Sequence, residues 1–170
     1  MVDQITLQRI EAIHPKLREE LRQIYKEICE KFPANTGVRF VQVLRTFAEQ
    51  DALYAQGRNG DKRQKVTEAV GGKSYHNYGL GIDFVLLYDK NKDGKIQTDE
   101  IVWNREIDLD NDKIADWIEV VRIFQKYGWT WGAAWKDFPH FEKPFGYKVS
   151  QLLAKYKAGD FIPGTKYVNL

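Results

Sequence analysis

The stretch SYHNYGLGIDFVLLY, residues 74–88, decides the fold of this chain. Its end, residues 83–88, is a short apolar run, which predicts a β-strand that is buried on both faces. Its beginning contains two glycines and a histidine, so it predicts a loop that leads into the strand. His76 and Asp83 lie seven residues apart, one in the loop and the other at the entry of the strand. Such a strand needs covering elements, which the flanking sequence has to supply.

The clearest covering element is a helix predicted at about residues 15–31. Leu17, Leu21, Ile24 and Ile28 recur there at spacings of four, three and four, which places all four on one helix face. Weaker patterns predict a strand at 38–43 and helices at 46–56, 116–127 and 149–158. The remaining segments predict a long polar loop at 57–73, an extended aromatic segment at 129–141 and a docked tail at 161–170. Helices and short strands without regular alternation indicate the α+β class.

Composition excludes several classes of protein. The 170 residues are 43% hydrophobic and 29% charged, which is typical of a folded domain and argues against disorder. No apolar run is long enough to span a membrane, and no secretory leader is visible at the start. The single cysteine, Cys29, excludes an internal disulfide and a cysteine-rich zinc finger.

The formal net charge is only +2, which gives no support to a strongly basic nucleic-acid binder. One local cluster is basic, and it consists of Arg58, Lys62, Arg63 and Lys65. This cluster would suit the anionic polymers of a cell wall as well as it suits a nucleic acid. We therefore expect no nucleic-acid partner.

Two of the three histidines form a candidate metal site with one carboxylate. His76, Asp83 and His140 offer the three-ligand set of a catalytic zinc, with a fourth position left for water. Asp137 lies three residues before His140, where a carboxylate can take a proton from attacking water and deliver it to a leaving amine. The alternative is structural: His76 as a hydrogen-bonding loop residue and Asp83 as a strand-end cap. The residue types alone leave both interpretations open.

The pattern Ser74-x-His76-x6-Asp83 followed by Asp137-x-x-His140 resembles the zinc peptidases of bacterial cell walls. These are the VanY-type D-Ala-D-Ala carboxypeptidases and the L-alanyl-D-glutamate endopeptidases of phage endolysins. The segments that look most like the endopeptidase branch are 44–58, 66–69, 71–80 and Trp131-Gly132. The resemblance runs from about residue 41 to 142. It implies a Hedgehog/DD-peptidase-like fold, a small antiparallel sheet with flanking helices, over a single domain of residues 1–170.

The resemblance also implies a role for each matching residue. His76, Asp83 and His140 would hold the zinc, and Asp137 would be the general base and acid. Arg45 would stabilise the oxyanion that develops on the scissile carbonyl. Three further positions would bind or border the substrate, namely Ser74, Gln50 and Tyr54. Gln50 and Tyr54 are equally consistent with packing, and Ser74 with orienting the His76 loop. The compact segment 131–137 departs from the family, which leaves substrate preference open.

An acidic insertion at about residues 89–119 contains two candidate calcium loops. The first, DKNKDGKIQTDE at 89–100, fits the pattern D-x-[DN]-x-[DN]-G-x5-E at every specified position. Its expected ligands are Asp89, Asn91, Asp93, the carbonyl of Lys95, and Glu100. The second loop, at 108–119, is a weaker copy because Lys113 stands where glycine is expected. Its expected ligands are Asp108, Asp110, Asp112, Asp116 and Glu119; the alternative is a solvated acidic turn.

Together these features predict a zinc metallopeptidase that hydrolyses the peptidoglycan stem peptide, with the L-alanyl-D-glutamate bond as the first expectation. Zinc-bound water would attack the carbonyl with Asp137 as its base. The alternatives are a D,D-carboxypeptidase of the same family and a non-enzymatic calcium-binding module associated with the wall. We expect Zn2+ as the cofactor, with Ca2+ as a second candidate. We also expect peptidoglycan as the partner, no integral membrane contact, and a monomer. It would be made in the cytoplasm and released at phage or prophage lysis.

Overall fold

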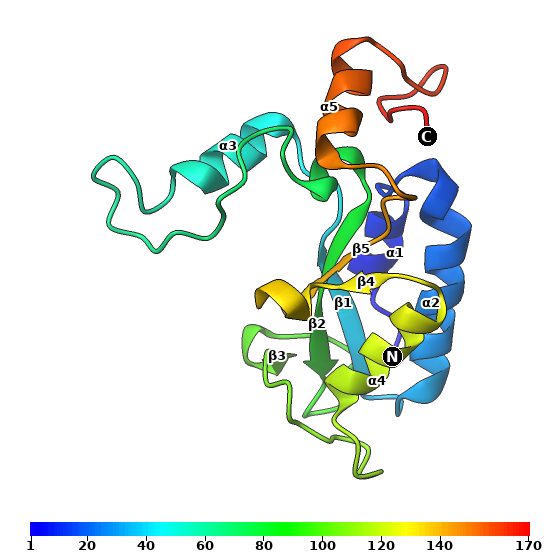
Figure 1. Cartoon of the computed structure of the whole chain (residues 1–170). Helices are drawn as coiled ribbons and strands as arrows, with labels where there is room; N and C mark the ends of the chain where they lie inside the picture. The colour runs from blue at the N-terminus through cyan, green and yellow to red at the C-terminus, as the bar shows by residue number, and fades with distance from the viewer.

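The computed structural model describes residues 1–170 and contains one sheet of five strands (Figure 1). The strands are β1 (Thr36–Gln42), β2 (Gly81–Tyr88), β3 (Ile101–Val102), β4 (Thr130–Trp131) and β5 (His140–Glu142). Their order is β1-β2-β5-β4, and every neighbouring pair is antiparallel. One edge of β2 pairs with β1, while β5 and β3 pair with the first and second parts of its other edge. The predicted α+β class and antiparallel sheet are confirmed.

The predicted helices are present with small shifts at their ends. They are α2 (Arg18–Lys31), α3 (Phe47–Ala55), α4 (Asp116–Lys126) and α5 (Val149–Lys157). Residues Pro15–Leu17, which we expected to open the first long helix, form a separate turn of 3-10 helix. A further helix, α1 (Gln4–Ile10), was not predicted, because its seven residues bury only Thr6 and Ile10. None of the helices combines the length and apolar composition needed to cross a membrane.

The strand that the opening stretch predicted is the centre of the core. Residues 84–87 of β2 are completely buried, as expected for a strand covered on both faces. Helices α2 and α4 pack beside each other over the sheet (Figure 1). The ring of Trp117 on α4 lies 4.4 Å from that of Phe84, and the ring of Phe124 stacks 4.3 Å from that of Phe141. These aromatic pairs hold α4 against β2 and β5, the two strands that carry the candidate metal ligands.

Helix α3 and the loop after it project from the body as an arm (Figure 1). The predicted polar loop at 57–73 is confirmed. The loop returns along α3 and is bonded to it. Arg58 joins the start of this loop to its later part, because its guanidinium donates to the Thr67 carbonyl at 3.0 Å and pairs with Glu68 at 2.5 Å. The backbone N–H of Gly71 donates to Asp51 on α3 at 2.6 Å. The arm is therefore tied at several points to its own helix.

The aromatic segment at 129–141 is not continuously extended, so that prediction was wrong. The short strands β4 and β5 are separated by a turn of 3-10 helix at Gly132–Trp135. Gly132 opens the turn at a crowded point, since a Cβ there would collide with the carbonyl oxygen of Asp137. The chain can reverse between β4 and β5 because this position has no side chain.

Candidate metal centre and active-site cleft

The structure brings His76, Asp83 and His140 together in one cluster. The Nε2 atom of His76 lies 3.1 Å from Nδ1 of His140, and each of these nitrogens lies 3.0–3.2 Å from Oδ1 of Asp83. Asp83 and His140 are direct partners in the antiparallel pairing of β2 with β5. His76 comes from the 3-10 helix Tyr75–Tyr78 that precedes β2. Asp83 and His140, 57 positions apart in sequence, therefore meet because of strand register, and the 3-10 helix before β2 adds His76.

Local sequence explains how His76 is held. The Oγ of Ser74 accepts a hydrogen bond from the His76 backbone N–H at 3.3 Å and so caps the short helix. The side chain of Asn77 accepts from the backbone N–H groups of Gly72 and Ser74 at 3.0 and 3.2 Å. Gly81 gives the rings room, since a Cβ there would lie 3.0 Å from Cε1 of His140. Ser74 thus orients the loop, which was one of the two roles expected for it.

The outer nitrogen of each imidazole has an acceptor of its own. Nδ1 of His76 lies 2.8 Å from the Val43 carbonyl, and Nε2 of His140 lies 3.1 Å from a carboxylate oxygen of Glu142. A proton on each outer nitrogen leaves the inner lone pairs, Nε2 of His76 and Nδ1 of His140, facing Asp83. Two nitrogens and one carboxylate oxygen supported in this way are the donor set of a catalytic zinc site. The residues present therefore fit zinc.

The electrostatics of the cluster favour a cation. Burial opposes ionisation of Asp83, but the two adjacent imidazoles hold its pKa below the usual range. Burial would lower the pKa of His140, but hydrogen bonds to Asp83 and Glu142 outweigh it and raise that pKa to about 9. Two carboxylates thus stabilise positive charge at this point, and a bound divalent ion supplies that charge in place of a proton.

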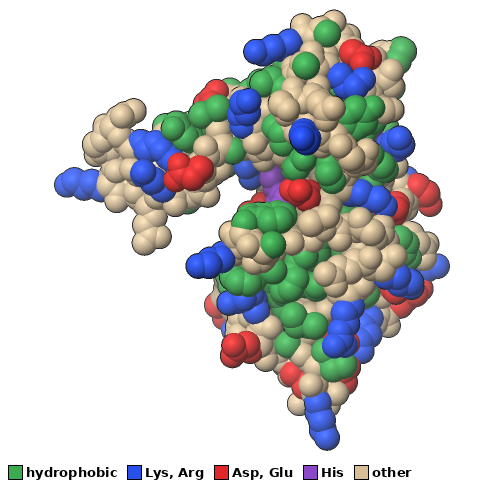
Figure 2. Space-filling model, in the orientation of Figure 1, with side chains coloured by type: hydrophobic (Ala, Val, Ile, Leu, Met, Phe, Trp, Pro, Cys, Tyr) green, Lys and Arg blue, Asp and Glu red, His purple; other side chains and the backbone are tan.

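A cleft of about 920 Å3 opens above the cluster, between the arm and the body. Its lining includes His76, Asp83 and His140 together with Arg45 and Asp137. In Figure 2 histidine is visible at the bottom of the notch where the arm meets the body. All five residues that the resemblance assigned to zinc binding or catalysis therefore face one cavity.

Asp137 is placed by the turn between β4 and β5. Its backbone N–H donates to the Gly132 carbonyl at 3.0 Å, and its own carbonyl accepts from the His140 N–H at 3.2 Å. Partial burial in the cleft and the negative charge of Asp83 raise the pKa of its carboxyl group. A carboxylate with a raised pKa is better suited to accept and return a proton than an ordinary aspartate.

Arg45 lies beside the cluster, with Nη2 3.9 Å from Oδ2 of Asp83. Its Nη1 donates to the side-chain oxygen of Gln50 at 2.8 Å, whereas its Nε is buried without a partner. Of the three positions predicted to bind or border the substrate, Ser74 lines the cleft, whereas Gln50 and Tyr54 do not. Gln50 is completely buried and also donates to the Ala69 carbonyl at 2.8 Å, so it positions Arg45 from behind. Tyr54 stacks under the guanidinium of Arg58 in the arm.

Sequence reasoning missed three residues of the site. Glu142 supports His140, Gly132 permits the turn that carries Asp137, and Trp135 lines the cleft with its ring 6.1 Å from that of His140. Glu142 could have been found from the sequence, because it lies two residues after His140 and residues two apart on a strand point to the same face. Gly132 belongs to the Trp131-Gly132 segment of the resemblance, which assigned it no role, and Trp135 had no signal, since its place in the cleft depends on how the turn folds.

In both acidic loops the first aspartate accepts backbone N–H bonds with both oxygens, but the loops differ in how their carboxylates converge. In residues 108–119 the carboxylates converge in two groups, Asp108 with Asp110 and Asp116, and Asp110 with Asp112 and Glu119. Burial and the neighbouring negative charges raise the pKa of Asp116 to about 6. In residues 89–100, Asp89 and Glu100 each accept backbone N–H bonds with both carboxylate oxygens. Calcium binding by the loop at 89–100 stays a prediction. The carboxylates of the loop at 108–119 lie closer together, so its negative charge is more concentrated.

The fold and the cluster define a class: small α+β proteins with a two-histidine, one-aspartate metal centre at the floor of a cleft. Residues 67–143 match the family model described as D-alanyl-D-alanine carboxypeptidase. This match covers slightly less than half of the chain, and it agrees with the resemblance drawn from the motifs.

Two known proteins are similar to the chain, one in sequence and one in fold. It is 46% identical over 114 residues to the peptidoglycan L-alanyl-D-glutamate endopeptidase CwlK of Bacillus subtilis. That match covers 64% of this chain and 63% of the relative, slightly less than two thirds of its length. The solved structure of the L-Ala D-Glu endopeptidase ChiX of Serratia marcescens has a similar fold. Its TM-score is 0.51 at 18% identity, covering 85% of this chain and 90% of that one.

Proposed function

We propose that this protein is a zinc-dependent peptidase that hydrolyses the L-alanyl-D-glutamate bond of the peptidoglycan stem peptide. The observation that carries the proposal is the convergence of His76, Asp83 and His140 below a cleft that also contains Asp137 and Arg45. The curated relative with 46% identity is named as an enzyme that cuts this bond. Its substrate therefore becomes the first candidate for this chain, and the cell wall becomes the proposed place of action.

Three residues of this chain would hold the metal, and two would carry the remaining chemistry. When bound by His76, Asp83 and His140, zinc supplies a Lewis acid and lowers the pKa of a water molecule. Asp137 accepts the proton of the attacking water at its carboxylate and returns it to the nitrogen of the leaving amine. Its raised pKa brings the two protonation states closer in energy at neutral pH, which proton return requires.

In this proposal Arg45 stabilises the oxyanion. Its guanidinium is largely buried at the wall of the cleft and carries a donor, Nε, that no protein group uses. A carbonyl oxygen that gains negative charge during attack would satisfy this donor more strongly than the neutral substrate does. Gln50 fixes the guanidinium at its other end, so the donor is oriented before substrate arrives.

A second candidate is a D,D-carboxypeptidase, because the matching family model carries that description. Digestion of purified peptidoglycan followed by mass spectrometry separates the two activities. Endopeptidase action leaves fragments that begin with D-glutamate, whereas carboxypeptidase action releases free D-alanine. Fragments beginning with D-glutamate, lost on treatment with a zinc chelator and restored by Zn2+, are the expected result. Intact stem peptides in the presence of zinc would contradict both activities.

The role of Asp137 is tested with Asp137→Asn. We expect kcat/KM to fall by about 10²–10⁴-fold, the usual contribution of a general acid–base residue, while one zinc per chain is retained. Asp137→Glu keeps a carboxylate with a longer reach and should recover part of the activity. Zinc content from elemental analysis separates loss of the base from loss of the metal. Full turnover by zinc-loaded Asp137→Asn would show that another group is the base.

A further inference from the structure

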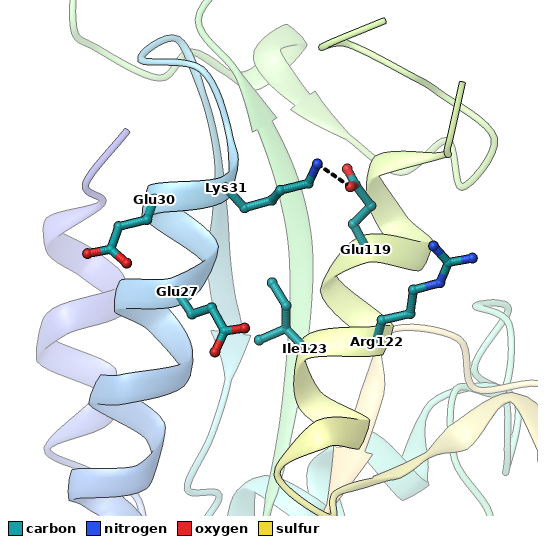
Figure 3. Close-up of a pocket in the computed structure, with 6 residues that line it drawn as sticks. All are labelled: Glu27, Glu30, Lys31, Glu119, Arg122 and Ile123. Carbon is teal, nitrogen blue, oxygen red and sulfur yellow. Dashed lines mark ion pairs between the residues drawn. The ribbon is translucent and has the colours of Figure 1, made fainter. Parts of the chain in front are cut away.

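A second group of metal-ligand side chains lies outside the cleft, where the loop 108–119 runs into α4. The atoms that Asp108, Asp110 and Asp116 offer lie within 4.8 Å of one another, and so do those of Asp110, Asp112 and Glu119. The two groups share Asp110, so the five carboxylates form two adjoining groups of three. Beside it, a hollow of about 420 Å3 separates α2 from α4 (Figure 3).

An independent observation comes from Glu119, in the first turn of α4. The residue is only 6% exposed, and its Oε2 is buried without any hydrogen-bond partner. Leaving a buried carboxylate oxygen unpaired is costly, and native structures rarely do so without a ligand to satisfy it. Because Glu119 belongs to the converging group with Asp110 and Asp112, this oxygen belongs to a carboxylate that is aimed into the cluster.

Lys31, at the end of α2, shows that the cluster already attracts a cation. Its Nζ lies 2.7 Å from Oε1 of Glu119, 3.0 Å from Oδ2 of Asp112 and 3.8 Å from Oδ2 of Asp110. Figure 3 shows the lysine reaching across from α2 to Glu119 on α4. One ammonium charge against five carboxylates leaves a large negative excess, and Lys31 contacts only one side of the group.

We propose that residues 108–119 bind one Ca2+ ion, and that the ammonium of Lys31 competes for the same carboxylates and withdraws when the ion binds. Every donor in the cluster is an oxygen, which suits Ca2+ and disfavours the nitrogen- and sulfur-seeking transition metals. Carboxylates of Asp108, Asp110, Asp112 and Glu119, with the Ile114 carbonyl at the seventh position, supply the six to eight oxygens that Ca2+ takes. Lys113 fits the sixth position because its backbone is left-handed, with φ of 73°.

The proposed ion would tie together parts of the fold that support the cleft. It would join the loop to α4, whose Trp117 packs 4.4 Å from Phe84, the neighbour of Asp83 on β2. Binding should therefore raise the unfolding temperature of the zinc-loaded chain, and above Kd the rise should follow the logarithm of the calcium concentration. This site does not depend on the proposed peptidase activity, and its test needs no substrate.

Calorimetric titration of the zinc-loaded full chain with Ca2+, in buffer containing excess Mg2+, tests the site. We expect Asp110→Asn and Glu119→Gln each to weaken one site at least tenfold, because calcium affinity follows the number of ligand charges. Asp93→Asn, in the loop at 89–100, is the matched control and should leave that site unchanged. Both variants preserve side-chain shape, and circular dichroism verifies that they fold. Wild-type calcium binding in Asp110→Asn and Glu119→Gln would overturn the proposal.

The competition by Lys31 has its own test. Lys31→Met keeps the aliphatic chain but removes the ammonium, so Ca2+ affinity should rise about tenfold and the calcium-induced shift in unfolding temperature should grow. Lys26→Met is the control, because Lys26 is on the same helix and makes only an exposed pair with Glu30. Unchanged or weaker calcium binding by Lys31→Met would refute the competition.

Discussion

Each imidazole of the candidate metal site is fixed through its outer nitrogen. The acceptors are of different kinds, since His76 uses the Val43 carbonyl and His140 uses the carboxylate of Glu142. A carboxylate partner makes the imidazole a stronger electron donor and keeps its inner lone pair directed at the metal. Replacing Glu142 should therefore weaken metal binding more than it destabilises the fold.

We predict that Glu142→Ala weakens zinc binding by about 10–100-fold, the usual effect of removing such a partner. Glu142→Gln keeps an acceptor oxygen for His140 and should lose less. Competition with a colorimetric chelator measures both affinities. Glu106→Ala, which removes an exposed glutamate elsewhere, serves as the control for the change in net charge. Equal zinc affinities for Glu142→Ala and the wild type would show that the Glu142 contact does not support the metal.

At the scale of the element, one turn delivers both the proposed base and a metal ligand. The segment from Gly132 to His140 leaves β4, makes a turn of 3-10 helix and enters β5. Backbone bonds from Asp137 to Gly132 and from His140 to Asp137 close it on itself. The position of the base relative to the metal therefore depends on the backbone of this turn.

We predict that Gly132→Ala lowers kcat/KM by about 10²-fold, because the added Cβ forces the Asp137 carbonyl away and a shift near 1 Å is enough for that loss. The matched control is Gly128→Ala. Gly128, unlike Gly132, has a positive φ, and it has open space around it, so the cost should be about 1 kcal/mol of stability with kcat unchanged. Steady-state kinetics and thermal unfolding of the two variants compare them. Normal kcat/KM in a folded Gly132→Ala protein would mean that the turn adapts.

At the scale of the whole molecule, the C-terminal tail closes against the segment that carries the metal site. Nε2 of His14 lies 3.0 Å from the Val168 carbonyl, and the His14 backbone N–H donates to the Gly79 carbonyl at 2.9 Å. The hydroxyl of Tyr167 donates to the Ala12 carbonyl at 3.0 Å. The prediction of a docked tail is confirmed, and a buried histidine lies between the tail and the turn after His76.

Burial lowers the pKa of His14, so folding favours its neutral form. Its stabilising effect is complete above the pKa of the unfolded chain, about 6.5, and is lost as the pH falls below that value. Protonation would also make Nδ1 a donor and break the bond it accepts from the Lys16 N–H. We predict that the unfolding temperature of the wild type falls by a few degrees more than that of His14→Gln between pH 7 and pH 5. Parallel pH profiles would exclude His14 as the cause.

Much of the fold and of the site was predictable from local sequence. The periodic apolar residues of α2, the buried run of β2 and the polar loop of the arm each carry their pattern in contiguous residues. The residue types of the metal site were also visible, because two histidines and an aspartate in those motifs suit few other chemistries. Helix α1 was missed because it is too short to show a period.

The sequence by itself determined the four longer helices and the two long strands β1 and β2, which residues have the chemistry to bind metal, and which family their motifs resemble. The tertiary structure alone decided how these residues meet. The β2–β5 register pairs Asp83 with His140 and brings Glu142 to His140. Turns between distant segments place Gln50 behind Arg45. The same is true of the acidic loops, where the weaker motif at 108–119 gathers its carboxylates and the stronger one does not. Local patterns report periodicity and residue type, whereas convergence depends on contacts between residues far apart in the chain.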